Sequence, residues 1–398
     1  MKITFSTYDA PGFTGGPNSW LRRIVPDLKA AGIECQILFF IDSSSPENCP
    51  CWQDLQSQGF SCKAIFCGNP MFEQVRWLLS EVAKQPPDVF VTNLSVAGLY
   101  AGRWLKKAGI PTVGILHSDD NYYRSVLQKF VFGNASEQLS TLVCVSDFLT
   151  QYARSFGETD TKIEFIPYGV PIPQKTASPP QETMKLIYVG RLVEEQKQIS
   201  QVTAAMCRAV REIPNTLSII YGNGVDKSNA AQIIAEKGHN LPIKLGGEID
   251  NSQIQNVMLE AQILVLLSDY EGLPIALMEA MACGLVPICL DIRSGIPELI
   301  EDGVTGLLVQ DRNDGFIEAV KRLQNNPQLW QEISKQARAK IVNSYSHESC
   351  TQKWIKTLQE LKPATKDIET IREKLHRGYR VLLYLNNTLS AKQIEKVE

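Results

Sequence analysis

Short apolar runs alternate with amphipathic stretches along most of the chain. The runs are bounded by turn residues, a pattern typical of strands buried on both faces of a parallel sheet. The stretches between them, such as 19–31 and 72–84, have apolar residues at helical spacing. The predicted strands form a first series at 2–6, 34–41, 61–66, 89–92, 112–116, 141–145 and 163–166, and a second at 186–189, 217–221, 243–245, 263–267 and 286–290.

A polar, proline-rich segment separates the two series. Residues 171–183 read P-I-P-Q-K-T-A-S-P-P-Q-E-T, a composition typical of a linker. The alternation of strands and helices predicts an α/β protein with two doubly wound, Rossmann-like domains, which bind ligands at the carboxyl ends of their strands. We expect a first domain over 1–170, the linker, a second domain over 184–345, and a C-terminal segment over 346–398 that returns to the first domain.

Composition narrows the class of protein. The chain has 398 residues, of which 44% are hydrophobic and 21% charged, with a net charge of −3. This balance is typical of a globular protein and does not indicate a nucleic-acid partner. No apolar run approaches the roughly 20 residues of a membrane span, and the first residues lack the apolar stretch of a signal peptide. We therefore expect a cytoplasmic protein.

Ten cysteines are present, and most lie singly in apolar segments, as buried thiols do. Cys49, Cys51, Cys62 and Cys67 instead cluster in a polar stretch. Their C-x-C and C-x4-C spacings fit zinc-ribbon patterns poorly. A metal site or disulfide there remains the alternative to four unpaired thiols.

Two glutamates stand in an unusually apolar setting. Residues 268–284 read S-D-Y-E-G-L-P-I-A-L-M-E-A-M-A-C-G, and within 274–283 only Glu279 is not apolar. The pattern predicts an interior helix whose carboxylate needs hydrogen-bond donors, which a ligand's hydroxyls could supply. Glu271 is expected on the preceding loop, where the helix N-terminus and Gly272 favour phosphate binding. The alternative is a loop glutamate plus a core glutamate paired with an arginine.

Basic and glycine-rich segments follow other predicted strands. Arg191 and Lys197 come just after the strand K-L-I-Y-V, where a guanidinium fork and an ammonium charge would suit a diphosphate. On loops such residues are commonly just solvated surface. Gly222 begins half of a G-x-G-x-x-G fingerprint, but Lys227 occupies the third glycine position, so a nicotinamide site is poorly supported.

Two candidates lie in the first domain. Gly15 and Gly16 belong to the loop Y-D-A-P-G-F-T-G-G-P-N and would present backbone N–H groups to an anion, unless the loop is a plain turn. His117 follows a predicted strand and would face a ligand, unless it is a structural histidine paired with Asp119 or Asp120.

Taken in order, these motifs resemble the retaining glycosyltransferases of family 4, which have the two-domain GT-B fold with an interdomain cleft. The resemblance spans roughly residues 1–360 and is most specific over 263–309. It is carried by the early G-G, C-V-S-D (144–147), I-P-Y-G-V (166–170), V-G-R-L…K (189–197), the E-x7-E pair (271 and 279) and S-G-I-P-E-L-I-E-D-G-V-T-G-L-L-V (294–309).

The resemblance implies roles for the candidate residues. Arg191 and Lys197 would bind the donor diphosphate, Glu279 the ribose, and Glu271 the donor sugar, which His117 would also contact. The remaining donor-binding positions would be Gly15, Gly16, Gly222, Leu245, Gly246, Ile249, Gly272 and Leu273, with the base near 245–249. Two departures affect local contacts: Tyr168 replaces the usual Asn of a P-N-G motif, and Lys197 is one residue further from Arg191 than is commonest.

The implied activity is transfer of a sugar, with retention, from a UDP- or GDP-linked donor to a hydroxyl of a saccharide, a lipid-linked acceptor or a small molecule. No Asp-x-Asp occurs in the sequence, so we expect neither a metal nor another cofactor. The alternatives are a GT-B nucleotide-sugar epimerase, a phosphorylase, or a non-catalytic nucleotide-sugar-binding subunit.

The end of the chain is longer than the resemblance requires. A helix through Trp354 resembles the family's crossover, and beyond it Ile368, Ile371, Leu375 and Leu382 recur at helical spacing. This extension would pack on the first domain, mediate self-association, or touch a membrane surface, although its mild charge balance does not indicate the last.

Overall fold

A computed structural model describes residues 1–13, 15–361 and 365–376 of the chain. These residues form two compact units, one of Met1–Ile166 with the chain from Thr351 onward, the other of Pro167–Cys350. The second unit thus begins a few residues before the predicted domain end at 170. Residues 171–183, predicted as a linker, contain no helix or strand and belong to this second unit.

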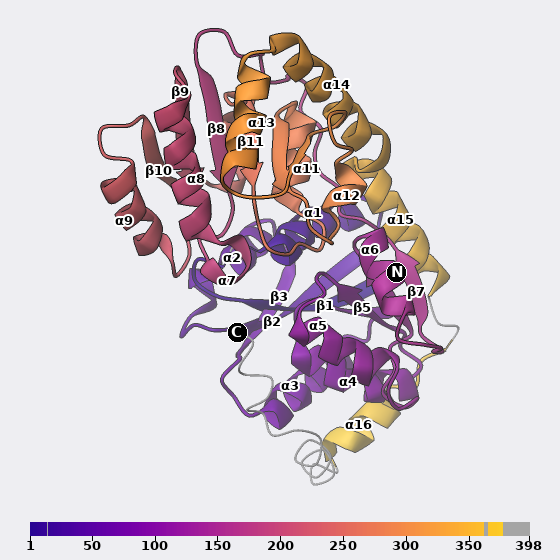
Figure 1. Cartoon of the computed structure of the whole chain (residues 1–398). Helices are drawn as coiled ribbons and strands as arrows, with labels where there is room; N and C mark the ends of the chain where they lie inside the picture. The colour runs from indigo at the N-terminus through magenta and orange to yellow at the C-terminus, as the bar shows by residue number, and fades with distance from the viewer. Residues whose placement is uncertain (14, 362–364, 377–398) are drawn as a thin grey trace. The chain divides into compact units, whose positions relative to one another are not determined.

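The first unit contains a seven-stranded parallel sheet in the order β3-β2-β1-β4-β5-β6-β7. A helix or a helical turn follows each strand from β1 to β6, as the sequence pattern predicts (Figure 1). Its strands are β1 (Lys2–Asp9), β2 (Glu34–Ile41), β3 (Ser61–Phe66), β4 (Val89–Thr92), β5 (Thr112–Leu116), β6 (Thr141–Cys144) and β7 (Lys162–Phe165). Its helices are α1 (Gly16–Ala30), α2 (Pro50–Ser57), α3 (Met71–Lys84), α4 (Val96–Lys107), α5 (Asn121–Val126) and α6 (Asp147–Arg154), with helical turns at Pro46–Asn48 and Leu127–Val131.

The second unit contains a six-stranded parallel sheet in the order β10-β9-β8-β11-β12-β13. Its strands are β8 (Met184–Val189), β9 (Thr216–Tyr221), β10 (Ile243–Gly247), β11 (Ile263–Leu266), β12 (Val286–Leu290) and β13 (Leu307–Val309). Its helices are α7 (Glu194–Lys197), α8 (Ile199–Glu212), α9 (Lys227–Lys237), α10 (Ile254–Leu259), α11 (Ile275–Cys283), α12 (Ile296–Leu299), α13 (Asp314–Gln324) and α14 (Pro327–Ser344), with a helical turn at Asn251–Gln253.

The sequence pattern predicts the strands closely. Each predicted strand is present, with its ends shifted by at most three residues, because strands such as β4, β6 and β11 are buried at every position. The three-residue strand β13 was not predicted. The helix predicted from Ser19 is α1, and it begins at Gly16 instead.

Both sheets reverse their strand order at an internal position. In the first unit β1 pairs with both β2 and β4, and in the second unit β8 pairs with both β9 and β11. In doubly wound sheets, the carboxyl edge at such a reversal is where ligands commonly bind. Gly15 follows β1, Arg191 follows β8 and Glu271 follows β11, so these candidate residues lie at the two reversals.

The C-terminal segment adds two helices, α15 (His347–Glu360) and α16 (Glu369–His376). The ring of Trp354 lies 4.9 Å from that of Trp20 on α1. Helix α16 packs on α3 and α4 and buries Ile371 completely (Figure 1). Helix α16 therefore has the first of the three roles considered for the extension, packing on the first domain. Leu382, the last residue of the predicted helical pattern, lies outside the described residues. Among the helices of the described part of the chain, none combines the length and apolar character needed to cross a membrane.

Candidate active site

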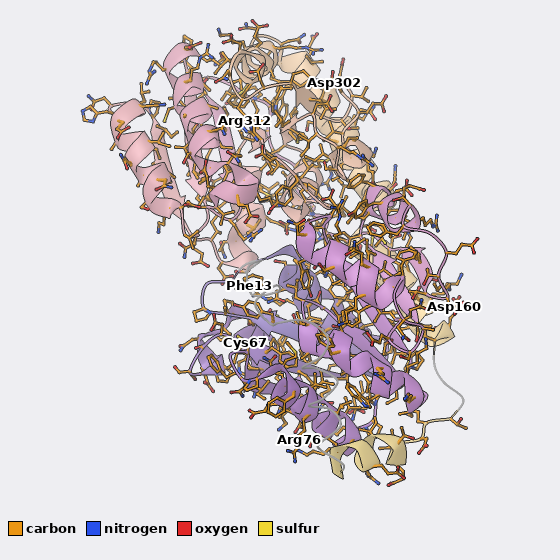
Figure 2. The ribbon with its side chains drawn as sticks, turned by 60° about the horizontal axis from the view of Figure 1, so that its bottom comes forward. Phe13, Cys67, Arg76, Asp160, Asp302 and Arg312 are labelled. Carbon is orange, nitrogen blue, oxygen red and sulfur yellow. The ribbon has the colours of Figure 1, made fainter. Side chains whose placement is uncertain are left out.

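In the second unit, hydrogen bonds join the two loops at the point where the strand order reverses. The loop after β8 leads into α7, and the loop after β11 leads into α11. The backbone N–H of Asp269 donates to the Gln196 carbonyl at 2.9 Å, and the Gln196 side-chain Nε2 donates to the Tyr270 carbonyl at 3.0 Å. Gln198 donates to the carboxylate of Asp269 at 2.6 Å. Arg312, which follows β13 and is labelled in Figure 2, contacts the same carboxylate. These loops therefore present their side chains as one surface.

An ion pair lies on this surface. The ammonium of Lys197 contacts the carboxylate of Glu271, and their side chains are only 13% and 6% exposed. Gln196 donates to the same carboxylate at 3.4 Å and accepts from Nη2 of Arg191 at 2.7 Å. The structure thus brings together Arg191, Lys197 and Glu271, three of the residues singled out in the sequence. Gln196, which joins them, carries no sequence signal beyond its position next to Lys197.

The surroundings of Glu271 keep neighbouring groups protonated. Burial raises the pKa of the Tyr188 phenol and of the Cys289 thiol above their ordinary values, and the carboxylate of Glu271 adds to both shifts. The Tyr188 hydroxyl donates to the Arg191 carbonyl at 2.7 Å and so anchors the loop after β8.

Helix α11 carries the second glutamate. Gly272, Leu273 and Pro274 are buried, and the helix begins at Ile275, so Glu279 lies on its second turn with 6% exposure. This is the apolar interior helix that the sequence predicts. The loop before it is tightly packed, because a Cβ at Gly295 would lie 2.0 Å from the Gly272 carbonyl oxygen.

The remaining predicted donor positions follow β9 and β10. Gly222 comes directly after β9 with φ of +140°, and a Cβ there would lie 1.8 Å from the Gly190 carbonyl oxygen. Leu245 and Gly246 lie in β10, and Ile249 follows it, half-buried. They occupy the same carboxyl edge of the sheet as Arg191, but no hydrogen bond joins them to it among those recorded for the described residues.

In the first unit, helix α1 begins at Gly16 with Gly15 as its N-cap. The loop that precedes it contains Phe13 (labelled in Figure 2), whose ring packs edge-on against Tyr8 at 5.4 Å. The helix N-terminus therefore lies at the carboxyl end of β1, where the sequence places an anion-binding loop.

His117 lies at the carboxyl end of β5, 7% exposed, with Nε2 2.7 Å from Oδ1 of Asn93. Burial lowers the pKa of His117 to about 3, so the imidazole is neutral at ordinary pH. Asn93 directly follows β4, and its Nδ2 donates to the hydroxyl of Thr7 on β1. Asn93 is therefore a hydrogen-bond partner of His117. Sequence reasoning considered Asp119 and Asp120 as partners and missed Asn93.

Asp9, the last residue of β1, is fully buried. Its Oδ2 accepts hydrogen bonds from the backbone N–H groups of Cys51 at 2.9 Å and Trp52 at 3.0 Å, in the first turn of α2. A carboxylate from a neighbouring strand thus caps this helix. Burial raises the pKa of Asp9 from its ordinary 3.8 to about 6, although these backbone hydrogen bonds and the charge of Arg22 oppose the shift.

None of the ten cysteines, all within the described residues, forms a disulfide. Cys49, Cys51 and Cys62 are buried, and Cys67 is half-buried. Over the residues that the structure describes, no three His, Cys, Asp or Glu side chains gather as a metal site. The structure thus contains no disulfide in the cysteine cluster.

Two Rossmann-like units, each built on a parallel sheet, are the architecture of the GT-B fold. Residues 14–173 match the family model "Glycosyltransferase Family 4", and residues 172–340 match "Glycosyl transferases group 1". The chain is therefore a glycosyltransferase of the GT-B fold.

Relatives agree with this assignment. The chain is 29% identical over 251 residues to the UDP-N-acetylglucosamine–peptide N-acetylglucosaminyltransferase GtfA subunit of Streptococcus pneumoniae, a match covering 61% of this chain and 48% of the relative. It is 27% identical over 289 residues to the amylovoran biosynthesis glycosyltransferase AmsK of Erwinia amylovora, covering 69% and 70%. The chain thus spans about half the length of the first relative.

Solved structures share the fold. Pneumococcal GtfA in complex with UDP and GlcNAc has a TM-score of 0.75 at 14% identity, with 91% of this chain and 99% of that chain covered. Anabaena HepE in complex with UDP has a TM-score of 0.72 at 18% identity, with 90% and 100% covered.

The burial of Asp9 predicts a pH-dependent stability. Because the folded state holds the Asp9 proton more tightly than the unfolded state, this group stabilises the fold below about pH 4, and that contribution is lost as the pH rises to about 6. The free energy of unfolding of Asp9→Asn minus that of the wild type should therefore rise by about 3 kcal/mol over this range. Urea unfolding at several pH values measures it, with Asp54→Asn on α2 as the control. A difference that falls with rising pH would contradict the expectation.

The buried Lys197–Glu271 ion pair predicts that substitutions of these two residues have non-additive effects on the free energy of unfolding. Glu271→Gln should leave the Lys197 charge buried without its partner and lower the free energy of unfolding by about 3 kcal/mol or more. Lys197→Met combined with Glu271→Gln should cost less than the two single changes together. Glu260→Gln, which removes the 72% exposed partner of Lys185, should cost under about 1 kcal/mol. Additive single effects in the urea unfolding cycle would show that the contact contributes little.

Proposed function

We propose that this protein transfers a sugar, with retention and without a metal ion, from a nucleoside diphosphate sugar to a hydroxyl of an acceptor. The observation that supports this most is the contact of Lys197 with Glu271 beside Arg191, at the carboxyl ends of β8 and β11. Two fixed positive charges suit a diphosphate, and a buried carboxylate suits sugar hydroxyls. Because Lys197 touches Glu271, the diphosphate and the sugar attached to it would be bound side by side.

UDP is the nucleotide we consider first, and GDP the second. The name of the pneumococcal relative states a UDP-linked donor, and the HepE and GtfA structures that share the fold contain UDP. In this proposal the base lies near 245–249 with Gly222 beside it, Glu279 binds the ribose, and the Gly15–Gly16 backbone assists at the diphosphate. Gly272 and Leu273 would contribute backbone groups next to Glu271.

The reaction follows from these charges. The bond between the anomeric carbon and the diphosphate oxygen breaks while the acceptor oxygen bonds to the same face of that carbon. The acceptor's proton passes to the departing phosphate oxygen, so no protein nucleophile is required. Arg191 and Lys197 stabilise the negative charge that develops on the leaving group, which is the largest catalytic contribution a preorganised site makes. His117 would contact the sugar close to the reacting carbon.

We expect metal independence because the sequence contains no Asp-x-Asp, so that Arg191, Lys197 and helix N-termini would neutralise the diphosphate. The full chain, given UDP-glucose, UDP-GlcNAc or GDP-mannose with a panel of saccharide and lipid-linked acceptors, should transfer sugar equally with and without EDTA. Proton NMR of the product should show the donor's anomeric configuration.

Each alternative has its own outcome in this experiment. Activity lost in EDTA and restored only by Mg²⁺ or Mn²⁺ would rule out metal independence, and an inverted product would rule out retention. Conversion of the donor to another nucleotide sugar without acceptor would identify an epimerase. Donor binding without turnover under all conditions would identify a binding subunit.

Calorimetric titrations with UDP should show different effects of substituting Glu271 and Glu279 on UDP affinity. Glu279→Gln removes an acceptor for ribose hydroxyls, which UDP and UDP-sugars share, and a charged hydrogen bond contributes about 1.5–3 kcal/mol. We therefore expect a roughly 10- to 100-fold weaker Kd for UDP. Glu271→Gln should leave UDP binding nearly unchanged while impairing transfer, and Glu260→Gln serves as the folded control. If Glu271→Gln is the variant that loses UDP affinity, the assigned roles are reversed.

A further inference from the structure

In the second unit, the loops after β8 and β9 are joined backbone to backbone. The Leu192 N–H donates to the Asn223 carbonyl at 2.9 Å, and the Asp226 N–H donates to the Leu192 carbonyl at 3.0 Å. A Cβ at Gly224 would lie 2.3 Å from the Leu192 carbonyl oxygen, so a side chain there would collide with the backbone. The loop after β9 therefore fixes the loop that leads from Arg191 into α7.

A carboxylate from the loop after β9 caps α7. Val193, the residue before this helix, makes no side-chain cap. The Glu194 N–H, the first of α7, donates instead to Oδ2 of Asp226 at 2.7 Å. Asp226 precedes α9 but makes no side-chain cap there, and its Oδ1 accepts from the exposed side chain of Asn229 at 3.2 Å. Asp226 thus caps a helix in a different loop rather than the one that it precedes.

Helix α7 depends on contacts of this kind because it is a single turn, Glu194–Lys197. Forming a first turn fixes several residues for few hydrogen bonds, so a turn of this length is unstable by itself. The next residue, Gln198, has a left-handed backbone with φ of +50° and ψ of +46°, which is unfavourable for residues other than glycine. Its side chain donates to Asp269 at 2.6 Å, and the Glu194 carboxylate accepts from the Ser200 N–H of α8 at 3.0 Å. Neighbouring segments therefore set the position of α7.

Lys197 is the last residue of α7, so its place depends on where the turn begins. It lies three positions after Glu194, about 4.5 Å along the helix. Its ammonium contacts the buried carboxylate of Glu271 on the loop after β11. A buried ion pair is favourable only with good geometry, so a shift of α7 would weaken this contact. The cap at Glu194 therefore affects the contacts of Lys197.

We infer that Asp226 is a positioning residue for Lys197: by capping α7, its carboxylate holds the Lys197 ammonium in the place where it binds the donor diphosphate. The cap and the Lys197–Glu271 contact both lie within the second unit, whereas the diphosphate contact rests on the proposed function. Asp226 acts through Lys197 in this scheme and touches neither the donor nor the reacting atoms.

Positioning and charge predict opposite effects of removing Asp226. Its negative charge lies about one helical turn from Lys197, so its removal would by Coulomb's law favour binding of a diphosphate there. Removal of the cap instead lets α7 open and lowers the fraction of molecules with Lys197 in place, which weakens binding. Asparagine separates the two effects, because it caps a helix as well as aspartate does and carries no charge.

Hydrogen exchange of the unliganded full chain, followed by mass spectrometry, tests the cap. Peptides covering 194–200 should exchange faster in Asp226→Ala than in the wild type, because the turn opens more often, and Asp226→Asn should restore the wild-type rate. Asn229→Ala is the matched control, because it removes the partner of the other Asp226 oxygen and should leave this segment unchanged. An unchanged rate in Asp226→Ala would overturn the inference.

Titration with nucleotide tests the consequence for the diphosphate. Calorimetry should show a Kd for UDP about fivefold weaker or more in Asp226→Ala, and in Asp226→Asn a Kd at least as tight as that of the wild type. The affinity for uridine, measured by ligand-observed NMR, should be equal in all three proteins, because uridine has no diphosphate for Lys197 to bind. Unchanged or tighter UDP binding by Asp226→Ala, or an equal loss for uridine, would overturn the diphosphate contact.

The Lys197–Glu271 ion pair gives a measurement that needs no nucleotide. The non-additivity of Lys197→Met and Glu271→Gln in urea unfolding should fall by roughly half or more in an Asp226→Ala background and stay unchanged in an Asp226→Asn background. The same non-additivity in all backgrounds would show that Asp226 does not position Lys197. If the wild type binds no nucleotide, the proposed function fails, and this cycle still decides whether Asp226 positions Lys197.

Discussion

The reversal of strand order within each parallel sheet is the constraint on which the rest of the structure depends. Because β1 and β4 in one unit, and β8 and β11 in the other, are neighbours without being consecutive, the loops after them lie next to each other at the carboxyl edge of the sheet. Side chains from distant parts of the sequence then meet at one edge. Lys197 and Glu271 meet at one such edge, and Thr7, Asn93 and His117 meet at the other.

The two edges offset the free-energy cost of burying polar side chains in different ways. The second unit buries opposite charges in contact, which is favourable only with good geometry and further hydrogen bonding, and Gln196 supplies one such hydrogen bond to Glu271. The first unit buries neutral amides and hydroxyls around one carboxyl group, each matched to a donor or acceptor. One edge therefore holds a buried pair of opposite charges, and the other holds mainly uncharged polar groups.

The sequence predicts the sheet far better than the site. Apolar runs such as 263–267 identify strands because both faces of a parallel sheet are buried. The three-residue strand β13 is too short to give a pattern. Arg191, Glu271 and Glu279 stand out because each is a charge beside or within an apolar segment, and Lys197 because it follows Arg191 just after a predicted strand. Thr7, Asn93 and Gln196 do not, because a single polar residue at the end of a strand or in a loop is common. Their meaning comes from which strands are neighbours, and no local pattern encodes that.

The capping of α2 by Asp9 has a consequence for how this unit can diversify. A helix usually takes its cap from the residue just before it, which ties the preceding loop to one length and one composition. Here Cys49 precedes the helix and makes no side-chain cap, while a strand in the middle of the sheet supplies the acceptor. The connection over 42–49 therefore does not need to supply the N-cap side chain of α2. Insertions or substitutions there would leave the start of α2 anchored, so this part of the surface is open to change during evolution or engineering while the sheet beneath keeps its register.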